Sequence, residues 1–298
     1  MLKEDFTSVG IIKKNQSKLF GYMFVTTVIL GLLGCFISQV FHFGLTGTGC
    51  FLLAAGVIDF IAYYYSDSFI IKSENAIKIE DEQVPEYYEL VKNLCDNANI
   101  KMPRLYFIDT PAINAFATGR NIDKAVLVVT KGLLEKLNPD EIKGVIGHEL
   151  AHIESGDMKL MSVLSILSGL ICILSDMIWY SGTIDRASSR DQSGVLAIIG
   201  LVISLLAPIT SVIIKFAVSR NREFVADARG AEIAGNPEFL AKALNKIKHD
   251  RIQVPNPSKA TAHLYIASPF RGDFIGELFS THPDIDERIN RLNNMKLI

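Results

Sequence analysis

His148-Glu149-Leu150-Ala151-His152 places two histidines four residues apart, with a glutamate directly after the first. On a helix these histidines lie one turn apart on the same face, so both imidazoles can bind one zinc ion. The glutamate between them can reach a water molecule at the metal and act as its base. In a chain of 298 residues with 6 histidines, chance produces the pattern in roughly 1% of cases. The stretch therefore predicts a zinc-dependent hydrolase.

A helix is expected to carry this stretch, because its start is well marked. Asn138 is a suitable N-cap, Pro139 fits the first helical position, and Glu141 completes a capping box. Apolar residues then recur at helical spacing: Ile142, Val145, Ile146, Leu150 and Ile153. The two histidines border this apolar stripe, which places them at the edge of the core, as a cleft requires.

A third zinc ligand is expected from residues 220–227. A catalytic zinc site needs three protein ligands and one open position. Glu223 and Asp227 are again four residues apart, so one carboxylate can bind zinc while the other orients a ligand histidine. The alternative is that Glu223 pairs with Arg220 or Arg222 at the surface, and spacing alone leaves both interpretations open.

The composition predicts membrane segments joined to a polar domain. Apolar residues make up 49% of the chain, and the mean hydropathy of +0.27 is high for a soluble enzyme yet low for a polytopic transporter. The net charge of −2 excludes a nucleic-acid binder that works by bulk positive charge.

Four apolar segments are long enough to cross a bilayer. They span residues 19–40, 47–65, 160–180 and 194–214. For the first, a lipoprotein signal ending at Cys35 is the alternative, but the apolar run continues to Val40, which favours a retained helix. The second contains Asp59 near its polar end, which predicts a shallow position with access to water.

Basic residues gather in three of the polar regions, which predicts that both termini and the polar domain are cytoplasmic. His152 precedes the third span by 8 residues and Glu223 follows the fourth by 9, so a membrane hairpin brings both to the same face. The expected organisation is a cytoplasmic segment 1–18, a first hairpin 19–65, a catalytic domain in two parts, 66–157 and 215–298, and a second hairpin 158–214.

At these motifs the chain resembles the HtpX-like membrane zinc metalloproteases, distant relatives of the CAAX prenyl proteases. The motifs are 114–120 (NAFATGR), 148–152 (HELAH) with 156–158 (GDM), 219–227 (SRNREFVAD), 281–283 (THP) and Arg288-Ile289. The likeness covers nearly the whole chain. It implies an α+β, zincin-like domain with a small β-sheet, fused to four transmembrane helices.

The resemblance also implies an activity and a set of site residues. His148, His152 and Glu223 would bind one Zn²⁺ per chain, and Glu149 would be the catalytic acid and base. The implied activity is quality control, in which misfolded or damaged membrane proteins are cleaved at the cytoplasmic face of a prokaryotic inner membrane. The expected partners are membrane-protein or unfolded polypeptide substrates and the lipid bilayer, without nucleic acid.

Residues 113–120 and 125–129 are expected to form neighbouring strands, and an exposed edge there can hold a substrate by strand addition. Asn114 and Phe116 are the candidates to line that edge, with core packing as the alternative for Phe116. Residues 250–280 contain several prolines and a glycine, a composition typical of a mobile flap.

His282 is the candidate for a second donor to the developing oxyanion, and the alternative is a residue that only precedes a helix beginning at Pro283. Two other functions remain open. One is a prenyl-protein protease, for which four spans are few. The other is a membrane scaffold or transporter with a structural metal, although a structural zinc site needs four protein ligands.

Overall fold

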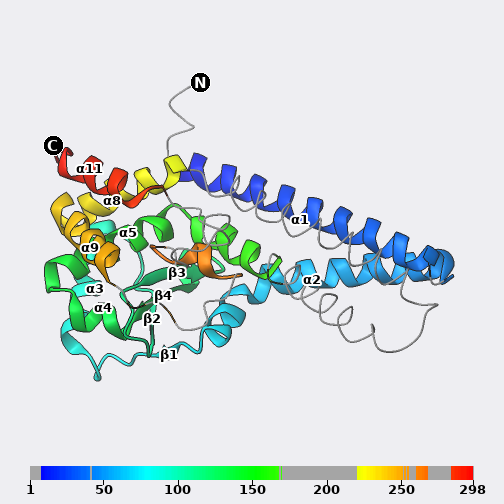
Figure 1. Ribbon diagram of the computed structural model, residues 1–298, viewed down its shortest axis with the longest axis horizontal. Helices are drawn as coiled ribbons and strands as arrows, with labels where there is room; N and C mark the ends of the chain where they lie inside the picture. The colour runs from blue at the N-terminus through cyan, green and yellow to red at the C-terminus, as the bar shows by residue number, and fades with distance from the viewer. Residues whose placement is uncertain are drawn as a thin grey trace.

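The computed structural model describes residues 8–40, 42–167, 169, 220–250, 252, 254, 260–267 and 283–297. A long helical hairpin extends from one side of a domain in which helices surround a small sheet (Figure 1). The predicted third and fourth spans lie outside the described residues, apart from 160–167 and 169.

Helices α1 (Ser8–Val40) and α2 (Gly44–Ser73) form the hairpin and pack side by side (Figure 1). Large apolar side chains point outward from both helices: Phe20, Phe24, Leu32, Leu45, Leu53 and Phe60. Such a surface is more stable against lipid acyl chains than against water. Of the residues that the structure describes, α2 is the one helix whose length and apolar composition suffice to cross a membrane.

The carboxyl group of Asp59 connects the two helices of the hairpin. Its Oδ2 accepts a hydrogen bond of 2.5 Å from Thr27 Oγ1, and the residue is only 8% exposed. The side chain therefore faces α1 rather than reaching outward to water. A polar contact between apolar helices favours one register of the hairpin, because a slip would leave the buried carboxyl group of Asp59 without this partner.

The sheet contains four short strands in the order β1-β2-β4-β3. They are β1 (Ile77–Lys78), β2 (Arg104–Ile108), β3 (Ala115–Gly119) and β4 (Ala125–Thr130). The β3–β4 pair is antiparallel and confirms the two neighbouring strands expected from the sequence, whereas β2 and β4 are parallel. β3 is an edge strand, and it packs against α5, the helix that carries both histidines.

Helices cover the sheet and make up most of the domain. They are α3 (Pro85–Ala98), α4 (Lys131–Lys136), α5 (Pro139–Glu154), α8 (Arg220–Ala234), α9 (Pro237–His249) and α11 (Ile285–Asn293), with short 3₁₀ turns η1 (Ile122–Lys124) and η3 (Ala262–Leu264). One face of the sheet packs with α3, α5 and α9, and the other packs with the end of α2 and residues 261–267. The expected α+β class thus takes the form of a mostly helical domain around a small mixed sheet.

Candidate metal centre and active site

Helix α5 presents His148, Glu149 and His152, and its start follows from local sequence. The amide N–H of Glu141 donates to Asn138 Oδ1 at 2.9 Å, and the amide N–H of Asn138 donates to Glu141 Oε2 at 2.8 Å. This is the capping box expected from the sequence. The helix ends at Glu154, before a turn in which Gly156 has a φ of +70°.

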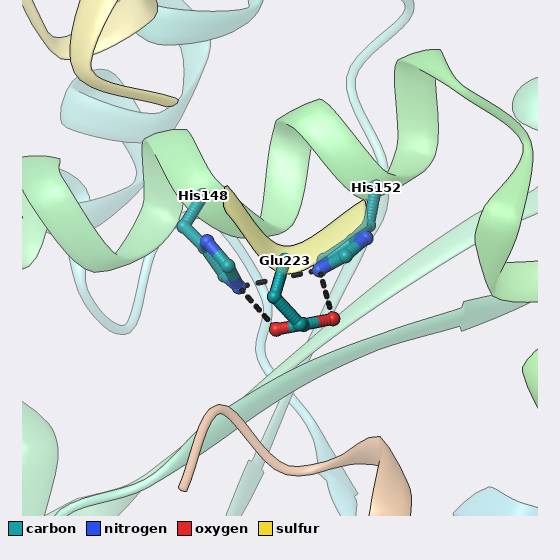
Figure 2. Close-up of side chains that lie close together, drawn as sticks. All are labelled: His148, His152 and Glu223. Atoms are coloured by element: carbon teal, nitrogen blue, oxygen red, sulfur yellow. Dashed lines mark hydrogen bonds and ion pairs between the residues drawn. The ribbon is translucent and has the colours of Figure 1, made fainter. Parts of the chain in front are cut away.

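Three metal-binding side chains meet between α5 and α8 (Figure 2). His148 Nε2 and His152 Nε2 are 3.2 Å apart, and the two oxygens of Glu223 lie 3.7 and 3.6 Å from these nitrogens. Ligand atoms at zinc distances of about 2.0–2.1 Å in a tetrahedron are separated by about 3.3–3.4 Å. The cluster, whose ligand atoms all lie within 4.8 Å of one another, therefore fits one tetrahedral metal ion with an open fourth position.

Two glycines allow the close approach of the helices that brings Glu223 to the histidines. A Cβ atom at Gly230 of α8 would lie 2.6 Å from the backbone nitrogen of His148. A Cβ atom at Gly147 of α5 would lie 2.5 Å from the Gly230 carbonyl oxygen. Neither contact is possible for a larger residue without a backbone shift, because interiors are close-packed. Glycine at these two positions thus sets the spacing of α5 and α8.

His148 is oriented from the side opposite the metal position. Its Nδ1 lies 2.9 Å from Asp227 Oδ1, so the imidazole presents Nε2 to the metal. Asp227 in turn accepts two hydrogen bonds from Arg288, of 2.9 and 2.7 Å. Arg288 is 1% exposed and also donates to the carbonyl oxygen of Ile266 at 2.9 Å.

His152 has a carboxylate of its own in Asp157, whose Oδ2 lies 3.5 Å from His152 Nδ1. Asp157 also accepts from Arg222 Nε at 3.0 Å. Each histidine is thus backed by a carboxylate, and each carboxylate is paired with an arginine. Paired and hydrogen-bonded carboxylates are the form in which buried charges are stable.

Burial and neighbouring charges shift the pKa values of these groups. Burial lowers the pKa of His148, although Asp227 opposes the shift. Burial also acts to lower the pKa of His152, but Glu223 and Asp157 outweigh it and raise the value to about 9. Against the effect of burial, Arg288 holds the pKa of the Asp227 carboxyl well below its usual range.

Glu149 lies beside the histidines with properties suited to proton transfer. Its side chain is buried, and burial raises its pKa to about 7, against the opposing charge of His152. The backbone N–H of Ala117 on β3 donates to it. A carboxyl group with a pKa close to neutrality can both accept and release a proton at physiological pH.

The cavity next to these residues is small. Its volume is 20 Å³, about the room for one water molecule. Glu149, His152 and Glu223 line it together with His263 and Leu264 of η3. Residues 261–267, which contain η3, thus form a cover beside the candidate active site.

Residues 261–267 also contact the strand that was expected to have an exposed edge. The amide N–H of Ile266 donates to the carbonyl oxygen of Ala115 at 2.9 Å, and Asn114 Nδ2 donates to Ala267 O at 3.0 Å. All five residues of β3 are buried. The edge is thus covered at Ala115, because the outward carbonyl oxygen of this residue finds a partner within the same chain.

Phe116 packs in the core, against the buried side of the cover. Its ring is 0% exposed and meets Tyr265 edge-on at 5.0 Å between centroids. The predicted flap, 250–280, is described at 252, 254 and 260–267, and His282 lies outside the described residues. The sequence reasoning gave no role to Asp157, Arg288 or His263, although the first two stand in motifs that carry the family resemblance.

Comparisons with known proteins agree with this site. The sequence profile of Peptidase family M48 matches residues 81–296. The Protease HtpX homolog of Thermococcus sibiricus is 42% identical over 256 residues, which cover 84% of this chain and 87% of the relative. The Protease HtpX homolog of Methanocaldococcus jannaschii is 40% identical over 247 residues, with 82% and 87% covered.

The fold has a counterpart among solved structures. The crystal structure of S. mikatae Ste24p superposes with a TM-score of 0.51 at 19% sequence identity. The match covers 96% of this chain and 67% of that one. At this identity the likeness shows a shared fold.

Proposed function

Because the chain belongs to peptidase family M48 and is an HtpX-type membrane metalloendopeptidase, we propose that it cleaves misfolded or damaged membrane proteins at the cytoplasmic face of the membrane. The observation that carries the chemistry is the convergence of His148, His152 and Glu223 beside the buried carboxyl of Glu149. The helical hairpin, which leads directly into the domain, supports a site held close to the bilayer. The basic residues of the polar regions support the cytoplasmic side.

We propose that the two histidines and Glu223 bind one Zn²⁺ per chain. Zinc bound there would acidify water and polarise the carbonyl group of the scissile peptide. A hydrolytic role is favoured over a structural one, since structural zinc sites are closed by four protein ligands. The cluster found in the described part of the chain has three.

The proposed proton transfers run through Glu149. Its carboxylate takes a proton from the attacking water and delivers it to the departing amine, so no covalent intermediate on the enzyme is required. The N–H of Ala117 holds the carboxylate toward β3. Asp227 and Asp157 keep the imidazoles in the orientation that metal binding needs. His282 is the proposed second donor to the oxyanion.

We further propose that substrate adds to β3 as a strand, with Asn114 at its start. Backbone recognition of this kind tolerates varied side chains, which suits a protease for damaged proteins. Phe116 would support this strand from the core, since its side chain is fully buried and its backbone pairs with Val128 of β4.

The proposal is tested with Glu149→Gln in purified, solubilised protein. We expect this variant to retain zinc, because Glu149 is not a ligand, and to lose cleavage of an unfolded polypeptide. Glu154→Gln is the matched control, because it removes a carboxylate from the same helix. Glu154 does not belong to the cluster and pairs with Arg229 Nε at a distance of 2.8 Å. Undiminished cleavage by Glu149→Gln would refute the catalytic role. Zinc contents near zero in wild type and in Glu223→Ala alike would refute the metal site.

A further inference from the structure

Asn15 joins helix α1, which contains the predicted first span, to the catalytic domain through a buried side chain. It lies on α1, four residues before the predicted first span, and is 6% exposed. Its Nδ2 donates to Asp157 Oδ1 at 2.5 Å and to the carbonyl oxygen of Ser155 at 3.2 Å. Its Oδ1 accepts a hydrogen bond from Arg222 Nη2. Both ends of the amide are thus occupied by the catalytic domain.

Both charged partners of Asn15 lead to metal ligands. Asp157 Oδ2 is 3.5 Å from His152 Nδ1, on the side of the ring away from Glu223. Arg222 bonds to the same carboxylate oxygen at 3.0 Å and directly precedes Glu223 in α8. Asp157 therefore links the amide of Asn15 to His152, and Arg222 links it to Glu223.

The chemistry of the amide suits this position. Asn15 lies between a carboxylate and a guanidinium, and an amide can donate to the first while it accepts from the second. The side chains of Asp157 and Arg222 are 3% and 12% exposed, so water does not screen them. In such surroundings a lost partner leaves a buried polar group unsatisfied, and the groups that remain rearrange.

We propose that Asn15 is a positioning residue of the metal site, through which helix α1 of the hairpin fixes the orientation of His152 and the position of Glu223. The inference rests on the metal site of the proposed function. Its consequence is that metal affinity depends on the docking of a membrane helix. By linkage, bound metal stabilises the docked position of α1.

The test compares zinc affinities in a Glu149→Gln background, where cleavage of the protein by itself cannot interfere. Asn15→Leu removes both hydrogen-bonding ends of the amide. Gln16→Leu is the matched control, because it removes an amide from the next residue, which is exposed. Zinc dissociation constants are measured by competition with a chromophoric chelator. We expect Asn15→Leu to weaken binding about tenfold, the lower end of the range for loss of a ligand's own partner, because Asn15 acts through Asp157 and Arg222; Gln16→Leu should stay within twofold.

A double-mutant cycle distinguishes positioning from a general effect on α1. If Asn15 acts through Asp157, then Asn15→Leu adds little to the loss already caused by Asp157→Asn. Losses that multiply in the double variant would overturn the proposed route. Wild-type zinc affinity in folded Asn15→Leu would overturn the positioning role itself.

Hydrogen exchange gives a readout other than affinity. In the Glu149→Gln parent, we expect zinc to slow the hydrogen exchange of the backbone amides around Asn15. In Asn15→Leu, we expect zinc to leave these exchange rates unchanged. Should Asn15→Leu fail to fold, Asn15→Ser is measured in its place with the same expected direction, and wild-type affinity there would overturn the role. If the Glu149→Gln parent binds no zinc, the proposed function is contradicted. If the parent and its Asn15→Leu variant bind zinc with equal affinity, only this inference is contradicted.

Discussion

Gly230→Ala is expected to separate the two helices that build the metal site. The added Cβ atom would lie 2.6 Å from the backbone nitrogen and 2.7 Å from the Cα atom of His148. Ordinary contact begins at 3.4 Å, so α8 must move from α5 by about 0.8 Å, the difference between 3.4 and 2.6 Å. Both contacts are with backbone atoms, so no side-chain rotation can relieve them.

The shift has a cost in stability and a cost in metal binding. Overpacking of this kind destabilises by about 1–3 kcal/mol, of which the higher helix propensity of alanine offsets up to about 1 kcal/mol. Glu223 Oε2 is already 3.7 Å from His148 Nε2, slightly more than the separation of about 3.3–3.4 Å that tetrahedral zinc needs, and a movement of α8 increases this excess. We therefore expect zinc affinity to fall by at least tenfold.

The assay is a thermal melt of the solubilised protein together with a zinc titration. The net cost, up to about 3 kcal/mol, corresponds to a decrease of up to about 12 °C in the unfolding temperature for a domain of this size. Gly56→Ala is the control, because a Cβ atom there meets nothing within 4 Å. If Gly230→Ala binds zinc like wild type and melts at the same temperature, the spacing of α5 and α8 is not set by this contact.

Three more outcomes follow from the structure. Arg288→Lys should weaken zinc binding about 10–100-fold by competition titration, because lysine cannot supply both bonds to Asp227 and the bond to Ile266; unchanged affinity would contradict this. Removal of metal with a chelator should abolish cleavage and lower the melting temperature, and added Zn²⁺ should restore both, since a ligand of the folded state stabilises it. Glu74→Gln should raise the initial rate on an unfolded polypeptide, because Glu74 anchors the cover through Tyr265 at 2.6 Å; a lower rate would show that the cover assists the reaction.

The start of α5 and the strands β3 and β4 could be predicted because their signals are local. The capping box of Asn138 and Glu141 lies within four residues, and the run of apolar β-branched residues in β4 is typical of a buried strand. The histidine pair follows from helical spacing alone. For these features, neighbours in sequence are also neighbours in space.

The partners of the ligands could not be predicted in the same way. Arg288 is 61 residues from Asp227, and Asn15 is 142 residues from Asp157. A charged residue on an amphipathic helix such as α11 is usually exposed, and Arg288 is buried only because two carboxylate oxygens and a carbonyl oxygen receive it. For Glu223 the spacing left two interpretations open, and the α5–α8 packing brings it to the histidines.

The covered edge of β3 shows how a protease of this type can hold a formed site without cleaving at random. A peptide that adds to β3 needs the carbonyl oxygen of Ala115, which the amide of Ile266 already occupies. It also needs far more room than a cavity of 20 Å³. If substrate adds to β3 as we propose, its entry is a competition in which the cover gives up its bonds to β3 and to Glu74. Those bonds are accepted by a backbone carbonyl oxygen and by one carboxylate, so the backbone N–H groups of any extended, unfolded chain can replace the donors of the cover. In a folded protein the backbone N–H groups are already paired within its own structure.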